Sequence, residues 1–293
     1  MKILFIGAVE FSACVLQELI TMRANIVGVC TLSQSQINSD HVDLSRLAER
    51  AGIPVRLTPN INSEDSRAWI QSLNPDIVFC FGWSQIIKKE LLKIPPMGIV
   101  GYHPAALPSN RGRHPIIWAL VLGLTETAST FFFMDEGADS GDILDQRPVV
   151  IRKTDDATSL YKQITQVALS QIRDFVPRLA EKTYDRYPQD HQKANVWRKR
   201  GISDGIIDWR MSAESIHNLV RGLTRPYVGC HFIYMDHNIK VWKTEVVYDV
   251  SPNIEPGKVL AVDFDGVIIK AGLGAIRLCD ISPTINFHVG TYL

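Results

Sequence analysis

The chain has 293 residues, of which 46% are hydrophobic and 21% are charged, and this composition is typical of a folded globular protein. Its 31 basic and 31 acidic residues cancel, so no global field attracts nucleic acid or a membrane surface. Five scattered cysteines form no CxxC pair, which argues against a disulfide framework and a zinc site. Signal-peptide anatomy and a roughly 18-residue apolar span are both missing, so we expect a cytoplasmic protein without a membrane partner.

Apolar runs alternate with helical patterns in the first part of the chain. The run at residues 3–6 ends at Gly7 and is typical of a central parallel strand, and further strands are predicted at 26–30 and 76–81. Apolar residues at three- and four-residue steps between these runs predict helices. The alternation predicts an α/β fold with a doubly wound parallel sheet. Gly7 opens no G-x-G-x-x-G fingerprint, so we expect no dinucleotide site.

A His and an Asp follow two of the predicted strands. The run that starts at Ile99 breaks at His103-Pro104, and Pro104 keeps His103 out of helical geometry. We therefore expect His103 at the carboxyl end of a strand, where open α/β sheets place ligands. A strand at 127–134 leads into a turn that carries Asp139. Such residues also serve ordinary backbone hydrogen bonding, so the pattern alone leaves catalysis and local packing open.

The chain changes character near residue 200. A long amphipathic helix is predicted at 159–176, with Pro177 ending it, and the polar stretch 182–195 is interpreted as a linker. Beyond a helix capped by Ser212, short apolar runs are separated by Gly, Pro and Asp-Gly turns, a pattern typical of a small β-barrel or sandwich. We predict two domains, a catalytic domain at 1–190 and a smaller β-rich, barrel-like domain at 201–293.

Two motifs resemble the folate-dependent formyltransferase family. HPAALPSNRGR, which begins at His103, resembles the family's His-x-Ser-Leu-Leu-Pro-x-x-Arg-Gly motif, and GADSGDI resembles the Ala-Asp-x-Gly turn that carries the family's catalytic Asp. Segments 204–209 and 217–227 resemble the C-terminal domain shared by the tRNA and amino-sugar formyltransferases. The resemblance implies N10-formyltetrahydrofolate as cosubstrate, no metal, and catalysis by His103 and Asp139.

One position departs from the family pattern. The family usually has Asn two residues before the motif's His, as a further donor to the developing oxyanion, and this chain has Gly101 there. We name Asn110 and then Tyr102 as candidate replacement donors, with a backbone N–H as a third choice. An inactive or altered relative stays open, as does the interpretation that Gly101 makes room for a different substrate.

The resemblance also implies folate contacts. In the family, the segment after the strand at 76–81 holds the pterin. The positions that correspond to folate contacts are Trp83, Ile86, Ile87, Gly137 and Ala138. Core packing is an equally good interpretation of Trp83 and Ile86.

Charge guides the prediction of the amine acceptor. Residues 33–43 contain no Lys or Arg, and residues 201–293 contain 8 basic and 10 acidic residues. Since phosphate contacts dominate tRNA affinity, we expect a nucleotide-linked amino sugar, such as a 4-amino-4,6-dideoxy sugar of O-antigen synthesis, and no nucleic-acid partner. Arg111, Arg113 and His114 would contact its diphosphate, with helix-start packing or capping as their alternative role. Methionyl-tRNA formyl transfer and a non-catalytic folate- or nucleotide-binding relative remain alternatives, and a homodimer stays open.

Overall fold

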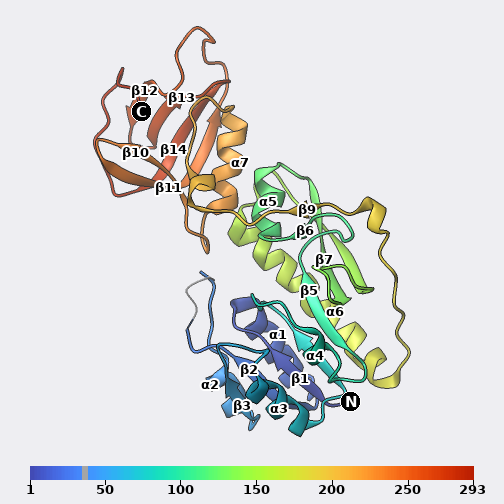
Figure 1. Cartoon of the computed structure of the whole chain (residues 1–293). Coiled ribbons are helices and arrows are strands. Elements are labelled where there is room, and N and C mark those ends of the chain that lie inside the picture. Colours follow the sequence, from blue (N-terminus) through green and yellow to red (C-terminus); the bar gives the residue numbers. More distant parts are fainter. Residues whose placement is uncertain (35–38) are drawn as a thin grey trace. The chain divides into compact units, whose positions relative to one another are not determined.

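The computed structural model describes residues 1–34 and 39–293, so the polar segment noted at 33–43 lies partly outside the described residues. The chain forms two compact units that interleave along the sequence (Figure 1). The first comprises Met1–Pro115, Thr127–Val149 and Lys162–Trp197. The second comprises Ile116–Glu126, Val150–Tyr161 and Arg198–Leu293.

A seven-stranded sheet forms the centre of the first unit, in the order β3-β2-β1-β4-β5-β7-β8. The pairs among β1 to β5 are parallel, and β7 is antiparallel to β5. Buried apolar runs such as Ile3–Ile6 form its middle, which confirms the predicted α/β fold with a parallel-dominated sheet. The strands are β1 (Ile3–Ile6), β2 (Ile26–Thr31), β3 (Val55–Leu57), β4 (Ile77–Cys80), β5 (Ile99–His103), β7 (Glu126–Phe133) and β8 (Ile143–Val150).

The topology reverses between β1 and β4. The chain winds outward from β1 to β2 and β3, then returns to β4 and β5 on the other side. Ligands bind at the carboxyl ends of the strands near such a reversal. His103 is the last residue of β5, which pairs with β4, so the fold puts it at this edge. The helices up to residue 181 are α1 (Glu10–Thr21), α2 (Ser45–Arg50), α3 (Glu64–Leu73), α4 (Lys89–Leu92), α5 (Pro115–Val121) and α6 (Ala157–Glu181). Most of α5 and the first residues of α6 belong to the second unit.

The prediction that Pro177 ends the long helix is wrong, because α6 continues through Pro177 to Glu181. A proline inside a helix removes one backbone hydrogen bond. Tertiary packing offsets that loss, since Phe175 is fully buried with its ring centroid 4.8 Å from that of Phe131 and 6.2 Å from that of Phe79. Packing therefore outweighs local propensity at this helix end.

The second unit contains a five-stranded antiparallel sheet in the order β10-β11-β14-β13-β12. This smaller C-terminal β domain confirms the predicted fold class. Its helix α7 (Ala213–Leu223) begins at the predicted cap, since the Ser212 hydroxyl accepts the Ser215 backbone N–H at 3.1 Å. The strands are β10 (Cys230–Tyr234), β11 (His237–Val247), β12 (Val259–Asp263), β13 (Gly266–Lys270) and β14 (Ala275–Ser282).

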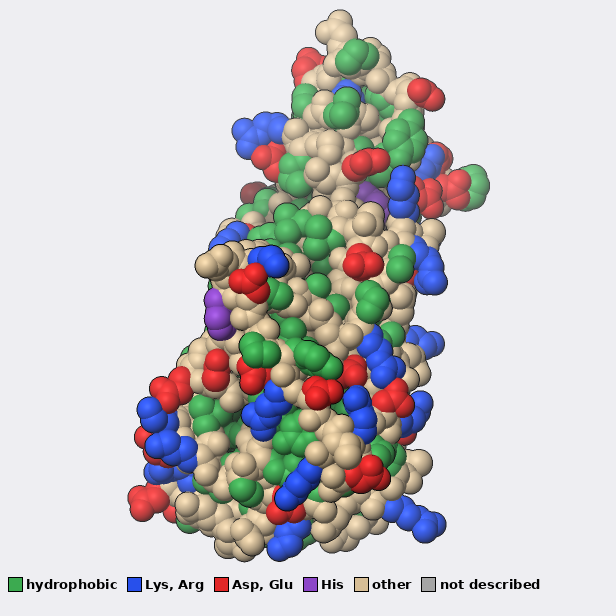
Figure 2. Space-filling view, turned by 90° about the vertical axis from the view of Figure 1, so that its right-hand side faces the viewer, with side chains coloured by type: hydrophobic (Ala, Val, Ile, Leu, Met, Phe, Trp, Pro, Cys, Tyr) green, Lys and Arg blue, Asp and Glu red, His purple; other side chains and the backbone are tan. Residues whose placement is uncertain are grey.

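Basic and acidic side chains are interspersed on the face of the molecule seen in Figure 2. Ion pairs between them include Arg210–Asp208 and Arg277–Asp263 in the second unit. Within residues 1–34 and 39–293, no helix combines the length and apolar character that a bilayer-spanning helix needs.

Candidate active site

His103 is held rigidly at the end of β5. Its side chain is almost fully buried, and its Nε2 lies 2.7 Å from the backbone carbonyl of Asn110. Because a carbonyl only accepts hydrogen bonds, Nε2 carries a hydrogen and donates it. The other ring nitrogen, Nδ1, lies 3.7 Å from Oδ2 of Asp139. The two residues that the sequence singled out therefore face one another.

The loop after His103 is fastened to the neighbouring strand β7. The Thr127 hydroxyl donates to the Pro104 carbonyl at 3.3 Å, and the Thr130 hydroxyl donates to the Ala105 carbonyl at 2.7 Å. Thr130 is also the register partner of His103. These bonds tie the loop to β7 and fix the direction in which the chain leaves the sheet.

The turn that carries Asp139 has its own internal framework. Oδ1 of Asp135 accepts the Gly137 N–H at 3.0 Å and the Ser140 hydroxyl at 2.7 Å. A Cβ on Gly141 would lie 1.8 Å from the Phe133 carbonyl oxygen, so only glycine fits this position of the motif. Asp139 itself has φ +52°, a left-handed conformation that Asp and Asn tolerate better than most residues.

The Asp139 carboxylate is oriented by a backbone donor. Oδ2 accepts the Gly112 N–H at 2.9 Å. Gly112 has φ +102°, and a Cβ there would lie 2.3 Å from the Trp197 carbonyl oxygen, so the position requires glycine. Since His103 Nδ1 and Asp139 Oδ2 are 3.7 Å apart, one substrate nitrogen or oxygen can lie about 3 Å from both. The arrangement suits proton transfer to or from that atom.

The two candidate replacement donors lie in different places. The Asn110 backbone contacts His103 directly and has φ +65°. Tyr102 alternates with His103 along β5 and therefore points to the other face of the sheet. Its hydroxyl lies 3.0 Å from the Ser129 hydroxyl and its ring stacks on Phe11 at 4.1 Å, while burial raises the pKa of the phenol. The Tyr102 hydroxyl is therefore held away from the His103 side of β5.

Neighbouring side chains fill the space beside Gly101. A Cβ at this position would lie 2.9 Å from Cγ of Met134 and 2.9 Å from Cζ of Phe132. Phe132 is the register partner of Gly101 on β7. Apolar groups therefore occupy the volume into which a side chain at residue 101 would extend.

The segment after β4 is anchored to the loop at residues 59–62. Asn62 donates to the Ile86 carbonyl at 2.9 Å and accepts the Lys88 N–H at 2.9 Å. Gln85 accepts the Ile61 N–H at 3.1 Å, and α4 starts after this stretch, at Lys89.

The side chains expected to contact folate differ in accessibility. Ile86 is 78% exposed, whereas Ile87 is 3% exposed and belongs to the core. Gly137 and Ala138 are exposed in the Asp139 turn. The Trp83 indole N–H is buried and has no hydrogen-bond acceptor among the described residues. Among all the residues that the structure describes, no group of three or more His, Cys, Asp or Glu side chains could hold a metal ion.

The three residues expected to bind a diphosphate differ in their surroundings. Arg111 is buried, and its guanidinium donates to Oε1 of Gln189 at 2.6 and 3.2 Å and to Nδ1 of His191 at 3.1 Å. Internal acceptors thus bind three of the hydrogen-bonding directions of Arg111, and its role as a phosphate contact stays a prediction. Arg113 reaches the Ser84 carbonyl at 3.5 Å, and His114 has φ +57°.

The stretch interpreted as a linker, 182–195, instead contributes to the site. It leads to β9 (Val196–Trp197), which pairs in parallel with β6 (Arg111–Gly112). It also places Asn195 against the loop that carries Asn110, and Gln189 against the turn that carries Asp139. Sequence reasoning missed these residues because the stretch is polar and lacks strand or helix periodicity. The feature that sets this stretch apart from an exposed linker is the burial of Gln189, which becomes visible only in the structure.

Comparison with known proteins identifies relatives across the whole chain. Residues 1–174 match the family model described as formyl transferase, and residues 202–285 match the formyl transferase C-terminal domain. A methionyl-tRNA formyltransferase of Geobacter metallireducens is 32% identical, covering 95% of this chain and 89% of its own. A methionyl-tRNA formyltransferase of Caldanaerobacter subterraneus is 30% identical, and the match covers 99% of this chain and 94% of that relative.

Solved structures share the fold. An N-formyltransferase from Helicobacter canadensis, solved with folinic acid and dTDP-3-aminofucose, has a TM-score of 0.73 at 18% identity and covers 95% of this chain and 99% of its own. A methionyl-tRNA formyltransferase from Clostridium thermocellum has a TM-score of 0.62 at 17% identity, with coverages of 84% and 93%. The resemblance to folate-dependent formyltransferases is confirmed by the family matches.

The prediction of a nucleotide-sugar acceptor without a nucleic-acid partner is wrong. Relatives about 30% identical over nearly the full chain are methionyl-tRNA formyltransferases, whereas the sugar enzyme above is similar at 18% identity and shares the fold alone. The prediction relied on the net charge of residues 201–293, and a net charge contains no information about where each charge lies. Acids such as Asp208 and Asp263 are paired with Arg210 and Arg277. The net charge therefore does not describe the electrostatic field at any one face of the protein.

Proposed function

Because the chain belongs to the formyl transferase family, we propose that it transfers the formyl group of N10-formyltetrahydrofolate to the amino group of methionyl-tRNA. The observation that carries the choice of acceptor is the 32% identity, over 95% of this chain, to a methionyl-tRNA formyltransferase. The geometry of His103 and Asp139 supports the chemistry, since an amine nitrogen can reach both side chains at once.

Asp139 is the proton acceptor in this proposal. The amine nitrogen forms the new bond to the formyl carbon and loses one proton, which passes to Oδ2. The Gly112 N–H keeps that oxygen aimed at the reacting position. The bond between the formyl carbon and N10 of the folate breaks, and N10 takes up a proton equivalent to the one removed from the amine, so the transfer needs no further reactant.

His103 stabilises the negative charge that develops on the formyl oxygen. Since its Nε2–H is bound to the Asn110 carbonyl, Nδ1 is the ring atom that faces the reacting position. In this role Nδ1 carries the hydrogen that is donated to the formyl oxygen.

The residues around the β4 loop fit the folate cosubstrate, which supplies the formyl group when bound. Trp83 offers a buried N–H with no acceptor among the described residues, and Ile86 offers an exposed apolar surface. The Trp83 indole would donate to a polar atom of the pterin while Ile86 covers a ring edge. Ile87, being buried, contributes only its backbone.

Replacing Trp83 with Phe tests this role. We expect the KM for N10-formyltetrahydrofolate to rise about 3- to 10-fold with a smaller change in kcat, because one hydrogen bond of about 1 kcal/mol is lost. Trp69→Phe is the matched control, since Trp69 packs against the same core cluster but lies on α3. Equal KM values for the two variants would assign Trp83 to packing alone.

The acceptor is tested by supplying purified protein with N10-formyltetrahydrofolate and a set of amines. We expect formylation of initiator Met-tRNA, detected as formylmethionine after mild deacylation, and no product with free methionine or dTDP-linked amino sugars. Binding of the tRNA should weaken as salt rises, because phosphate contacts release counterions. Formylation of an amino-sugar nucleotide in place of Met-tRNA would overturn the proposal.

A further inference from the structure

The segment that returns from α6 to the site, residues 182–197, makes hydrogen bonds to both of the loops that carry the site, which also meet each other at the Gly112–Asp139 hydrogen bond. One is the loop 109–114 between β5 and α5, and the other is the Asp139 turn between β7 and β8. Figure 1 shows this yellow segment running from the end of α6 back to β9, which lies beside β6. We call it the return segment.

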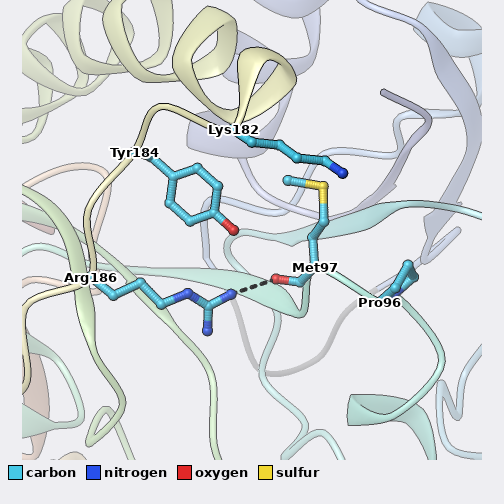
Figure 3. Close-up of a pocket in the computed structure, with 5 residues that line it drawn as sticks. All are labelled: Pro96, Met97, Lys182, Tyr184 and Arg186. Carbon is cyan, nitrogen blue, oxygen red and sulfur yellow. Dashed lines mark hydrogen bonds between the residues drawn. The ribbon is translucent and has the colours of Figure 1, made fainter.

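The return segment is fixed at its start. The Arg186 guanidinium donates to the Met97 carbonyl at 2.8 Å and lies 3.5 Å from the centroid of the Phe133 ring. Figure 3 shows the hydrogen bond between Arg186 and Met97, which line a surface pocket together with Lys182 and Tyr184. The pocket has a volume of about 480 Å³. Met97 precedes β5, so this anchor holds the segment to the end of β5 opposite His103.

Gln189 connects the two loops near the other end. Its Oε1 accepts both Arg111 donors, at 2.6 and 3.2 Å, and its Nε2 donates to the carbonyls of Asp139 at 2.9 Å and Gly141 at 2.7 Å. The partners define the amide orientation, because a guanidinium only donates and a carbonyl only accepts. Gln189 is buried, and these four bonds use its full hydrogen-bonding capacity.

Asn195 acts on the His103 side. Its Oδ1 accepts the Asn110 N–H at 2.7 Å, and its backbone carbonyl accepts the Arg111 N–H at 3.0 Å. The carbonyl of Asn110 is the acceptor for His103 Nε2. The side chain of Asn195 is exposed, so its bond competes with water and is weaker than those of Gln189.

We propose that Gln189 is a positioning residue for formyl transfer, which holds the Asp139 carboxylate at the reacting position, and that Asn195 assists by holding the His103 partner Asn110. Asp139 has a left-handed backbone, and the Gln189 bond to its carbonyl and the Gly112 bond to its carboxylate fix it from both ends. A displacement of about 1 Å at such a group costs on the order of 100-fold in rate. This inference rests on the proposed function for its activity readout only.

Two substitutions separate positioning from simple loop attachment. Gln189→Glu keeps the acceptor for Arg111 but loses both donors to the Asp139 and Gly141 carbonyls, whereas Gln189→Met loses all four bonds at similar volume. We expect both variants to lower kcat by about 10- to 100-fold with the KM for folate within about 3-fold of wild type. Recovery of wild-type kcat in Gln189→Glu would show that Gln189 merely anchors Arg111, and would overturn the proposal.

A second readout needs no substrate. The Gly112 N–H donates to Asp139 Oδ2, so its amide proton shift and exchange rate, measured by NMR with ¹⁵N-glycine labelling, report where the carboxylate lies. Asp139→Asn provides the reference for a changed acceptor. We expect Gln189→Glu and Gln189→Met to shift the Gly112 signal and speed its exchange, and Gln192→Ala, an exposed position in the same segment, to leave it unchanged.

The two readouts keep this inference distinct from the proposed function. If the wild-type protein fails to formylate Met-tRNA, the proposed function is contradicted. The Gly112 NMR signal would still test whether Gln189 positions Asp139. A Gly112 signal in Gln189→Met identical to that of wild type would overturn that role whatever the acceptor.

For Asn195, Asn195→Asp keeps the acceptor oxygen and should retain activity within about 3-fold, whereas Asn195→Leu should lose more than that.

Discussion

Asp139→Asn is expected to lower kcat by at least about 100-fold, the range lost when a general base is removed. The substitution is well matched to the site. Asn tolerates the left-handed φ of +52° at this position, and its amide oxygen can still accept the Gly112 N–H. Only the capacity to take a proton and the negative charge are lost, so a rate decrease cannot come from backbone strain. Thermal unfolding and folate binding should stay near wild type.

His103→Ala is expected to have an effect of similar size, about 100- to 1,000-fold in kcat, because it removes the donor to the developing charge. It also leaves a cavity and an unpaired Asn110 carbonyl, so stability must be measured alongside turnover. The double variant distinguishes the roles. If His103 and Asp139 act on one proton transfer, combining both changes should cost little more than either alone. Near-normal turnover in either single variant would contradict the assignment.

The sequence predicted the fold through its strongest signals. Continuous apolar runs such as 3–6 and 77–81 have to be buried on both faces, and this leaves a parallel sheet as the simplest arrangement. His103 could be placed at a strand end because Pro104 breaks the run at once. The end of α6 could not be predicted in this way. The packing of Phe175 against residues remote in sequence decides whether the helix continues past Pro177.

The candidate site was predictable only in part for the same physical reason. His103 and Asp139 are separated by 36 positions, and motif resemblance rather than periodicity brought them together. Gln189 could not be found this way, because its role depends on where Arg111 and the Asp139 carbonyl meet in space. The surroundings of Arg111 also depend on the fold. A cation beside a catalytic loop suggests a phosphate contact, but its donors are bound to internal acceptors.

Asn110 is the donor that we expect to stand in for the missing side chain at Gly101. It is in contact with His103 through its backbone, whereas the Tyr102 hydroxyl is bound to Ser129 on the other face of β5. Asn110→Gly and Asn110→Asp both suit the φ of +65° and keep the carbonyl bond to His103. Each should lower kcat by about 10- to 100-fold while the folate KM changes little, because a donor aimed at the transition state contributes little to ground-state binding.

Gly101→Asn is expected to damage the protein rather than restore a family-like site. The new Cβ would lie 2.9 Å from both Phe132 and Met134, so the side chain cannot enter without displacing packed apolar groups, at a cost of about 1–3 kcal/mol. We expect a lower Tm and a lower kcat. Gly101→Ala is the control for the Cβ alone, and Gly101→Asn combined with Met134→Ala tests whether space is the obstacle. If Gly101→Asn alone accelerates turnover and Asn110→Gly does not slow it, no compensating donor exists, and the enzyme works with one donor fewer.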